Sequence, residues 1–288
     1  MRVLITGGRG QLGRALTAAY GRHSTTTTLA PGRDELDVTN LEQLRKVVAD
    51  FRPELIVHAG AMTDVDGCES RVEEAYRVNA LGARYLALLA TVHNAPLLYV
   101  STNYVFPGDK EGPYYEWDRT GPRSVYGLSK LGGEEEVRRH SARYFIVRTS
   151  WLYDADPGSR NFVRTMLKLA DGGRAPLRGV ADQFGQPTYA PDLAAALIEL
   201  AATRAYGLYH LTNGGACSWY EWARELFRLT GRDVAIEPVP ATAFPRAATP
   251  PANGVLANCA GAALGITLPV WRDGLRRCVT AMGETAGE

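Results

Sequence analysis

Apolar runs of strand length alternate with longer segments of helical spacing through the first half of the chain. Runs rich in Val, Ile, Leu and Thr predict strands, and apolar residues that recur at helical spacing predict amphipathic helices. We expect strands at residues 2–6, 25–30, 55–58, 97–101 and 145–149. We expect helices between them at residues 11–20, 41–51, 72–93 and 125–140. Because strands and helices alternate, this half is predicted to be α/β, a doubly wound parallel sheet with right-handed crossovers.

The second half of the chain has a less regular pattern. We expect helices at residues 162–170, 191–203, from 218 to about 231, and 269–282, with an extended segment at 176–182 and a strand at 207–212. Residues 238–251 are rich in Pro, Ala and Thr and are predicted to form a long loop. The change of pattern indicates a second, smaller structural unit after the parallel sheet.

Three helix starts have the sequence of a capping box, in which a hydroxyl residue precedes a Glu by three positions. The hydroxyl accepts a bond from a first-turn N–H, and the Glu returns one to the backbone of the cap. The three pairs are Thr39 with Glu42, Ser70 with Glu73, and Ser218 with Glu221.

Composition and charge exclude several classes of function. The 288 residues are 45% apolar and 22% charged, with a formal net charge of +1, which is ordinary for a globular protein. No cluster of Lys and Arg forms a basic stripe, so we expect no nucleic-acid partner. No apolar run reaches the length of a membrane span and no signal peptide opens the chain, so we expect no membrane partner and a cytoplasmic location. The four cysteines are far apart and form no C-x-x-C, so neither a zinc site nor a disulfide framework is expected.

A glycine-rich turn joins the first predicted strand to the first predicted helix. The spacing is Gly7-x-x-Gly10-x-x-Gly13. Gly7 suits a tight turn, Gly10 lets the backbone approach a pyrophosphate, and Gly13 lets the helix pack close to the strand. The pyrophosphate then lies at a helix N-terminus, where free N–H groups favour negative charge. We therefore expect a Rossmann dinucleotide-binding domain from residues 1–150 and about 188–213, and a smaller C-terminal substrate-binding domain from residues 151–187 and 214–288.

The end of the second strand indicates which nicotinamide cofactor is bound. NAD-specific sites place an acidic residue there to bind the ribose 2′-hydroxyl. No acid lies at the tip of residues 25–30, and Asp34 and Glu35 come slightly late. Arg33 could instead hold a 2′-phosphate, so we expect a preference for NADPH, with NADH possible.

A Tyr–Lys pair is the candidate catalytic centre. Tyr126 and Lys130 are four residues apart on a predicted helix, so both project from one face. A phenol is a weak acid at neutral pH, and a neighbouring ammonium would lower its pKa. Thr102 lies at the carboxyl end of the fourth strand, where doubly wound sheets bind ligands, and could orient a carbonyl oxygen. We expect these three residues to be catalytic, although a Y-x-x-x-K spacing alone also occurs in ordinary surface pairs.

The chain resembles the dTDP-4-dehydrorhamnose reductases, an extended branch of the short-chain dehydrogenase/reductases. The motifs that carry the resemblance are the glycine loop, Ser-Thr-Asn-Tyr-Val-Phe-Pro-Gly at 101–108, Tyr-Gly-x-x-Lys at 126–130, Arg-Thr-Ser-Trp-Leu-Tyr at 148–153 and Asp-Gln-Phe-Gly-Gln-Pro-Thr at 182–188. The resemblance covers nearly the whole chain and weakens after about Thr230. It implies reduction of the 4-keto group of a dTDP-linked 6-deoxysugar, most simply dTDP-4-dehydrorhamnose, by NAD(P)H.

The glycine loop and Arg33 already indicate some cofactor contacts, and the resemblance implies further site residues. With Tyr126 and Lys130, the residues expected at the cofactor are Gly7, Gly10, Gln11, Leu12, Gly13, Arg33, Asp37, Val38, Ala59, Gly60, Ala61, Met62 and Thr63. The residues expected at the sugar nucleotide are Thr102, Asn103 and Trp151. Trp219 and Trp222 lie inside a predicted helix and are interpreted as packing residues.

The sequence departs from the family pattern at three places. Asn103 stands where the family usually has Asp, and the family's R-P-x-N-S stretch appears as Pro-Pro-Ala-Asn-Gly at 250–254. Some relatives dimerise around a metal held by a Glu, but that position is Ala15 here and a second ligand position falls near Pro191. We therefore expect no metal, and a monomer or weak homodimer. These departures leave the deoxysugar itself open.

Two other functions remain open. The regulatory β subunit of methionine adenosyltransferase resembles the same family and acts by binding a partner, although intact Thr102, Tyr126 and Lys130 favour an enzyme. A sugar-nucleotide epimerase with tightly bound NAD is the second alternative, and the missing acid after the second strand counts against it.

Overall fold

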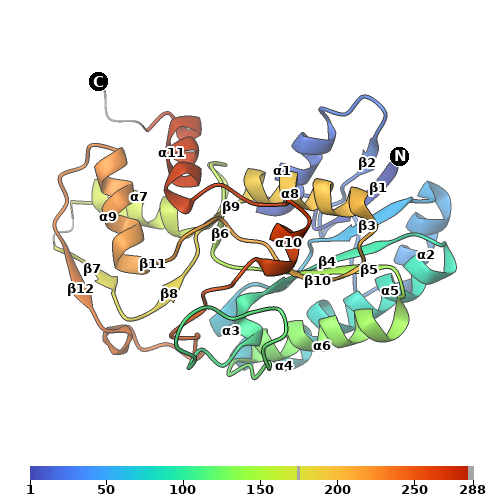
Figure 1. The fold of residues 1–288 in the computed structure, drawn as a ribbon, viewed down its shortest axis with the longest axis horizontal. Helices are drawn as coiled ribbons and strands as arrows, with labels where there is room; N and C mark the ends of the chain where they lie inside the picture. The colour runs from blue at the N-terminus through green and yellow to red at the C-terminus, as the bar shows by residue number, and fades with distance from the viewer. Residues whose placement is uncertain (174–175, 285–288) are drawn as a thin grey trace.

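A six-stranded parallel sheet forms the centre of the larger part of the molecule (Figure 1). The computed structural model describes residues 1–173 and 176–284. The strand order is β10-β5-β4-β3-β1-β2, so the order reverses between β1 and β3. The bounds are β1 Arg2–Thr6, β2 Thr27–Leu29, β3 Leu55–His58, β4 Leu97–Thr102, β5 Tyr144–Thr149 and β10 Gly207–His210. In such a sheet the crevice for a ligand lies at the carboxyl ends of the strands next to the reversal.

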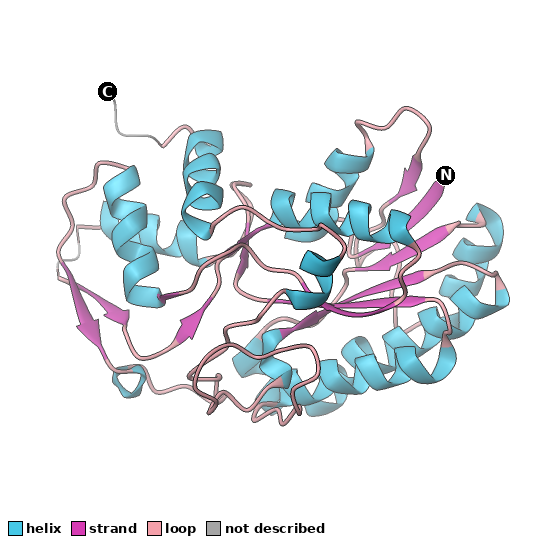
Figure 2. Ribbon diagram, viewed as in Figure 1, coloured by secondary structure: helices cyan, strands magenta, loops and turns pink. Residues whose placement is uncertain are grey.

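Helices cover both faces of the sheet (Figure 2). On one face α1 (Gln11–Tyr20) and α8 (Ala190–Thr203) pack against apolar side chains of β1, β3 and β5. On the other face lie α2 (Leu41–Phe51), α5 (Gly82–Val92) and α6 (Val125–His140). Every residue of β3 is buried, as expected for a strand covered on both sides. The doubly wound α/β fold predicted from the sequence is confirmed.

A smaller lobe, which we call the small lobe, lies beside the carboxyl ends of the strands (Figure 1). It contains the helices α7 (Phe162–Asp171), α9 (Trp219–Leu229) and α11 (Trp271–Met282) around one apolar core. Its sheets are two-stranded, formed by β6 Leu152–Tyr153 with β9 Thr188–Tyr189, β7 Leu177–Val180 with β12 Ile236–Val239, and β8 Phe184–Gly185 with β11 Cys217–Ser218. A short helix, α10 (Cys259–Ala263), returns to pack on β10 of the central sheet.

The element predictions were accurate in the parallel sheet and differed in detail elsewhere. Strand β2 is shorter than the expected 25–30, and the loop expected at 238–251 contains the end of β12 and the turn η3 (Ala241–Ala243). The helix expected at 72–93 is divided into α4 (Val72–Tyr76), a π-helical turn η1 (Arg77–Leu81) and α5. A short helix α3 (Val65–Ser70) precedes them and was not predicted, and a 3₁₀ turn η2 (Asn103–Val105) follows β4.

One of the three expected capping boxes is present. Ser218 and Glu221 make both reciprocal bonds at the start of α9. At α2 the cap is Asn40, which accepts from the Gln43 N–H, because the Thr39 hydroxyl bonds the Asp37 carboxylate instead. The Ser70 box is also wrong: Ser70 ends α3, and its hydroxyl donates to the Gly67 carbonyl within that helix.

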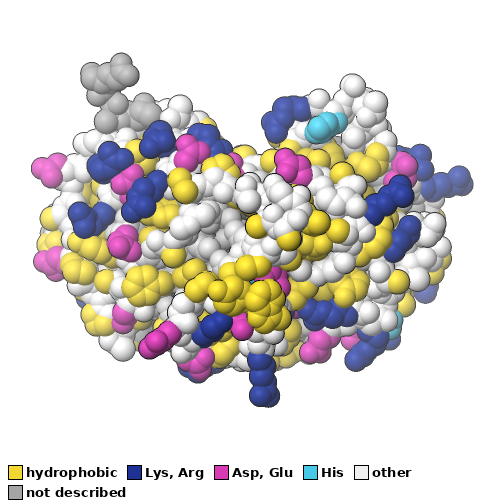
Figure 3. Space-filling model, viewed as in Figure 1, with side chains coloured by type: hydrophobic (Ala, Val, Ile, Leu, Met, Phe, Trp, Pro, Cys, Tyr) yellow, Lys and Arg dark blue, Asp and Glu magenta, His cyan; other side chains and the backbone are white. Residues whose placement is uncertain are grey.

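The surface carries mixed charge. On the face drawn in Figure 3, basic side chains are interspersed with acidic ones and form no continuous stripe. Within residues 1–173 and 176–284, no helix has the length and apolar character needed to cross a membrane.

Candidate active site

The glycine loop after β1 brings three backbone segments into close contact. Gly7 has φ +71°, and a Cβ added there would lie 2.7 Å from the Gly60 Cα at the end of β3. A Cβ on Gly13 would lie 2.2 Å from the Gly7 carbonyl oxygen. Gly8, which the predicted spacing passed over, is equally constrained, since its added Cβ would lie 2.0 Å from the Ala30 carbonyl oxygen. These positions therefore require glycine for packing.

The same loop leaves a helix end open. Helix α1 begins after Gly10, and no side chain in the described structure caps its first turn. A Cβ on Gly10 would meet only the Gly7 oxygen, at 3.2 Å, so the outer side of the loop is clear. First-turn N–H groups without a cap, together with the helix dipole, suit the two phosphates of a dinucleotide. The residues at this end fit the cofactor expected from the sequence.

The segment after β3 lies beside the glycine loop, and the Asn79 side chain holds it in place through hydrogen bonds. The Asn79 side chain is buried; its oxygen accepts from the Met62 N–H at 2.9 Å and its amide donates to the Met62 carbonyl at 3.2 Å. The same amide donates to the Ser129 hydroxyl on α6 at 3.0 Å. Asn79 lies in the π-helical turn η1, a local irregularity that recurs at functional sites. Sequence reasoning missed this residue, and its only signal was one Asn inside an apolar helix.

Tyr126 and Lys130 lie in the first turns of α6. The Ser124 side chain caps this helix by accepting from the Gly127 N–H at 3.2 Å. Gly127 lets the helix start against the turn after β4, because an added Cβ would lie 2.3 Å from the Tyr104 carbonyl oxygen. The Tyr104 and Tyr126 rings meet edge to face, with centroids 5.4 Å apart. The Tyr126 phenol lies near the Thr102 side chain.

The Lys130 side chain is buried against β4. Its side chain is 2% exposed, and its Nζ donates to the Val100 carbonyl at 2.7 Å and lies 4.0 Å from the centroid of the Tyr99 ring. Burial lowers the pKa of Lys130 to about 7, against a smaller opposing effect of the Glu134 carboxylate. Glu134 is itself buried and bound by two nitrogens of Arg148, at 2.8 and 2.7 Å.

These surroundings correct one sequence prediction. Lys130 was expected to lower the pKa of the Tyr126 phenol. Instead burial raises the pKa of Tyr126, and the neighbouring Thr102 hydroxyl opposes this only in part. The reason is geometric, since the Lys130 ammonium bonds the Val100 carbonyl and faces the Tyr99 ring. In this arrangement the phenol holds its proton at neutral pH.

Thr102 and Asn103 end β4 next to this phenol. The Thr102 hydroxyl donates to Asn103 Oδ1 at 3.3 Å and accepts from the Tyr104 N–H at 3.2 Å. Asn103 is 1% exposed, and its Nδ2 donates to the Gly254 carbonyl at 3.0 Å. Both ends of its amide are therefore engaged within the protein, and its expected contact with the sugar stays a prediction.

Trp151 follows β5 on the side of the small lobe. Its backbone has φ +44°, an uncommon conformation for a bulky residue. Its ring stacks on Trp219, with centroids 3.7 Å apart and an interplanar angle of 18°. A Cβ on Gly185 would lie 2.5 Å from the same ring. Trp219 was interpreted as packing alone, yet it is half-buried and supports the ring expected at the substrate.

Three further expected cofactor residues lie between β2 and α2. The Arg33 side chain is 81% exposed and lies 3.2 Å from the Glu74 carboxylate. Asp37 is exposed, and its carboxylate accepts two bonds from Thr39 at 2.9 Å. Val38 is nearly buried and packs on Gly82 at the start of α5. The Arg33 side chain is therefore not tightly packed. Val38 packs against the start of α5, in addition to its expected contact with the cofactor.

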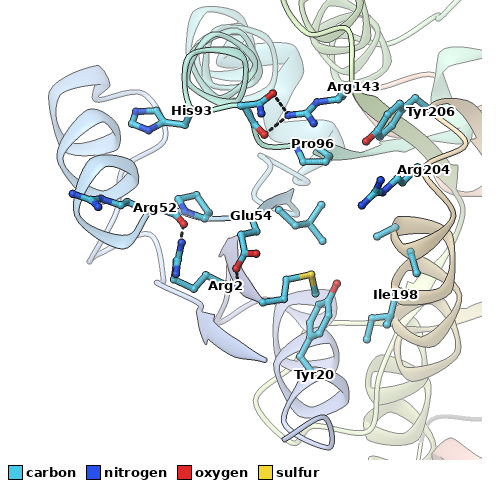
Figure 4. A pocket seen from close by; sticks show the side chains of 16 residues that line it. Arg2, Tyr20, Arg52, Glu54, His93, Pro96, Arg143, Ile198, Arg204 and Tyr206 are labelled. Carbon is cyan, nitrogen blue, oxygen red and sulfur yellow. Dashed lines mark hydrogen bonds between the residues drawn. The ribbon is translucent and has the colours of Figure 1, made fainter. Parts of the chain in front are cut away.

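A cavity of about 750 Å³ lies at the opposite, amino edge of the sheet (Figure 4). Its lining includes Arg2, Arg52, Arg143 and Arg204. Helices α2 and α8 end there at Arg52 and Arg204, and cations are favoured at helix C-termini. Arg143 donates to Asn94 Oδ1 at 2.6 Å, and Arg2 donates to the Arg52 carbonyl at 2.8 Å. Helix C-termini and local hydrogen bonds thus explain why arginines line this cavity. The cavity is remote from Tyr126.

Comparison with known proteins gives one consistent family. The model of the RmlD substrate binding domain matches residues 1–284. A dTDP-4-dehydrorhamnose reductase from Aggregatibacter actinomycetemcomitans is 42% identical over 267 residues, covering 88% of this chain and 90% of that protein. The crystal structure of a dTDP-4-dehydrorhamnose reductase from Clostridium acetobutylicum has a TM-score of 0.94 at 36% identity, covering 98% and 100% of the two chains. The Bacillus anthracis enzyme, solved in complex with NADP, has a TM-score of 0.92 at 38% identity, covering 97% and 98%.

Proposed function

The chain belongs to the dTDP-4-dehydrorhamnose reductase family, and from that premise we propose that it is a sugar-nucleotide 4-ketoreductase that uses NADPH. The reaction is reduction of the 4-keto group of a dTDP-linked 6-deoxysugar, with dTDP-4-dehydrorhamnose as the first candidate substrate. The observation that carries the proposal is the position of Tyr126 and Lys130 in the first turns of α6, next to Thr102 at the carboxyl end of β4.

The cofactor would lie along the carboxyl ends of β1 and β3. The proposed contacts are Gly7, Gly10, Gln11, Leu12, Gly13, Arg33, Asp37, Val38, Ala59, Gly60, Ala61, Met62 and Thr63, with Tyr126 and Lys130 at the nicotinamide end. The uncapped start of α1 supports the pyrophosphate position, and exposed Arg33 has the charge to bind a 2′-phosphate. When bound, NADPH supplies a hydride.

Tyr126 is proposed as the proton donor. The C4 carbonyl carbon receives the hydride, and the carbonyl oxygen takes a proton from the phenol and becomes the hydroxyl group. The raised pKa of Tyr126 supports proton transfer from the phenol to the substrate. The donor must hold its proton until the carbonyl oxygen of the substrate becomes basic. Thr102, next to the same phenol, would position the oxygen, and Lys130 would fix the ribose next to the nicotinamide. Trp151 would contact the sugar nucleotide.

The direct test measures NADPH oxidation against a panel of dTDP-4-keto-6-deoxysugars, with the products resolved by configuration at C4. We expect one NADPH consumed for each sugar reduced. Absence of turnover with every substrate, combined with co-purification with a larger enzyme, would instead indicate a regulatory subunit. Tightly bound NAD without net oxidation would indicate an epimerase.

A Tyr126→Phe variant tests the proton donor. We expect kcat to fall by about 10²- to 10⁴-fold, the usual contribution of general acid catalysis. The Kd for NADPH, measured by fluorescence or calorimetry, should stay within about twofold, because the ring and its contacts remain. Near-normal turnover would refute the role of Tyr126.

Further expectations also stand as proposals. The division into a dinucleotide-binding domain of residues 1–150 and about 188–213, with a substrate-binding domain of residues 151–187 and 214–288, is supported by the place of β10 in the central sheet. A cytoplasmic location, and a monomer or weak homodimer without a metal, are likewise proposed.

A further inference from the structure

Asn103 connects a proposed catalytic residue to a distant segment of the chain. It directly follows Thr102 at the end of β4, and its side chain is 1% exposed. Its Oδ1 accepts the Thr102 hydroxyl proton at 3.3 Å, and its Nδ2 donates to the Gly254 carbonyl oxygen at 3.0 Å. An amide can do both because it carries a donor and an acceptor at once, whereas an ionised carboxylate of the same shape only accepts.

Gly254 is fitted to this amide. A Cβ added at Gly254 would lie 2.2 Å from Asn103 Nδ2, far inside contact distance. Any side chain at this position therefore requires the amide to move. The bond between Asn103 and the Gly254 carbonyl exists in its present form only because residue 254 is glycine.

The segment around Gly254 is firmly held by the small lobe. The Gly254 N–H donates to the Phe184 carbonyl at 2.8 Å, and the Phe184 N–H donates to the Ala252 carbonyl at 2.8 Å. The Gln186 side chain bonds both the N–H and the carbonyl of Leu256, at 2.7 and 2.8 Å. The Gly254 carbonyl is therefore a fixed point of the small lobe, and it anchors Asn103.

The anchored Asn103 amide determines the orientation of the Thr102 hydroxyl. A threonine hydroxyl has one proton, and here Asn103 Oδ1 accepts it. Thr102 Oγ1 also accepts from the Tyr104 N–H at 3.2 Å. The Thr102 hydroxyl proton is therefore directed at Asn103, and one lone pair of Oγ1 is left to accept a further hydrogen bond. The orientation of the Thr102 hydroxyl thus follows from the position of the Asn103 oxygen.

We propose that Asn103 is a positioning residue that, anchored by the Gly254 carbonyl, orients the Thr102 hydroxyl at the proposed catalytic site. Thr102 is then correctly oriented only when the segment 252–254 of the small lobe lies against β4. This inference rests on the proposed function, since it assigns a role in that reaction. It differs from the expected direct contact of Asn103 with the sugar, because the buried amide acts through Thr102.

The experiment uses two single variants and their combination in the full-length protein. Asn103→Asp places a carboxylate opposite the Gly254 carbonyl, so two acceptors face each other. Gly254→Ser displaces the amide from the other side. We expect each single change to lower kcat by about 10- to 100-fold, the scale of a misplacement of about 1 Å. In the double variant the introduced serine hydroxyl can donate to the introduced carboxylate, so kcat should recover to within about fivefold of wild type.

The control is Asn94→Asp, the same chemical change at an exposed position at the amino edge of the sheet. The Asn94 oxygen accepts from Arg143 at 2.6 Å, a bond that an aspartate keeps and that does not lead to Thr102. We expect its kcat to equal that of the wild type. Thermal unfolding of the four combinations at positions 103 and 254 gives a double-mutant cycle that reports the contact independently of activity.

Separate results distinguish the possible failures. A kcat within twofold of wild type in Asn103→Asp would overturn the inference, as would a rise in substrate KM at constant kcat, which is the signature of a direct sugar contact. A double variant no better than the worse single variant would also overturn it. Failure of the proposed function would appear in the wild type itself, which would then oxidise NADPH with no substrate of the panel.

Discussion

At the scale of single residues, burial sets the protonation of the proposed catalytic pair. It raises the pKa of the Tyr126 phenol and lowers that of Lys130 to about 7. Both shifts have the same cause, because a low-dielectric environment disfavours the charged form of either group. The phenol therefore enters the reaction protonated, and Lys130 contributes its position and hydrogen bonds in addition to a partial charge.

Trp219 is a residue whose role the structure makes testable. It supports the Trp151 ring in a stack of 3.7 Å. Trp219→Leu should raise the KM for the sugar nucleotide about 2- to 12-fold, which corresponds to the roughly 0.5–1.5 kcal/mol of an aromatic pair. Steady-state kinetics would show this with kcat less affected, and Trp219→Phe should retain most of the wild-type affinity.

Trp117→Leu is the matched control for that change. Trp117 is 73% exposed and stacks on Tyr115, away from Trp151. It should leave KM unchanged. An unaltered KM in Trp219→Leu would mean that the Trp151 ring does not need its neighbour.

At the scale of elements, α6 combines catalytic residues with close packing on β4 and η1. Two adjacent glycines show how closely. A Cβ on Gly133 would lie 2.2 Å from the Tyr99 hydroxyl and 2.3 Å from the Asn79 carbonyl oxygen. A Cβ on Gly132 would lie 3.4 Å from the Ala80 Cβ, an ordinary contact. The same substitution at neighbouring positions should therefore have opposite effects.

Gly133→Ala should lower the free energy of unfolding by about 1–3 kcal/mol through overpacking. Gly132→Ala should raise it by about 0.5–1 kcal/mol, because alanine is the better helix former. Chemical denaturation of both variants measures the difference. Equal effects at the two positions would contradict the described packing of α6.

The local pattern of apolar residues predicts most of the regular helices and strands. It predicts the candidate site only in part. Helices α1, α2 and α6 begin and end where the apolar spacing predicted. The π-helical turn η1 was not predicted, because it depends on Asn79 bonding a segment after β3. The two-residue strands of the small lobe also escaped prediction, since each exists only through a partner far away in the chain.

The departures from the family pattern illustrate the same limit. The sequence showed Asn at 103 and Gly at 254 as separate differences, 151 residues apart. Only the fold places them in contact. The residue types of the site were thus readable from motifs, whereas their mutual orientation depends on tertiary contacts that no local pattern contains.

At the scale of the whole molecule, two buried histidines tie stability to pH. Burial lowers the pKa of His58 and of His210 from 6.5 to about 3. Between pH about 6.5 and about 3 the unfolded chain binds protons that the folded chain does not. The free energy of unfolding therefore falls as the pH falls through this window, by about 1.4 kcal/mol per pH unit for each histidine.

His58→Asn should make the pH dependence of the free energy of unfolding less steep, because one of the two titrating histidines is removed. Asparagine can keep the bond that the His58 ring makes to the Thr6 hydroxyl, although the smaller side chain lowers stability at every pH. Urea denaturation at a series of pH values gives the slopes. His23→Asn, at an exposed position, should have the wild-type slope, and an unchanged slope in His58→Asn would show that His58 is protonated in the folded state.

The path of the chain between the two lobes has a consequence for how such proteins diversify. The chain leaves the central sheet after β5, returns with α8 and β10, leaves again for α9, and returns once more with α10. No single stretch of sequence encodes the small lobe, so recombination cannot exchange it with one cut and one ligation. A gene fragment exchanged at one junction would combine parts of two different small-lobe cores, so we expect such a chimaera to be less stable than either parent.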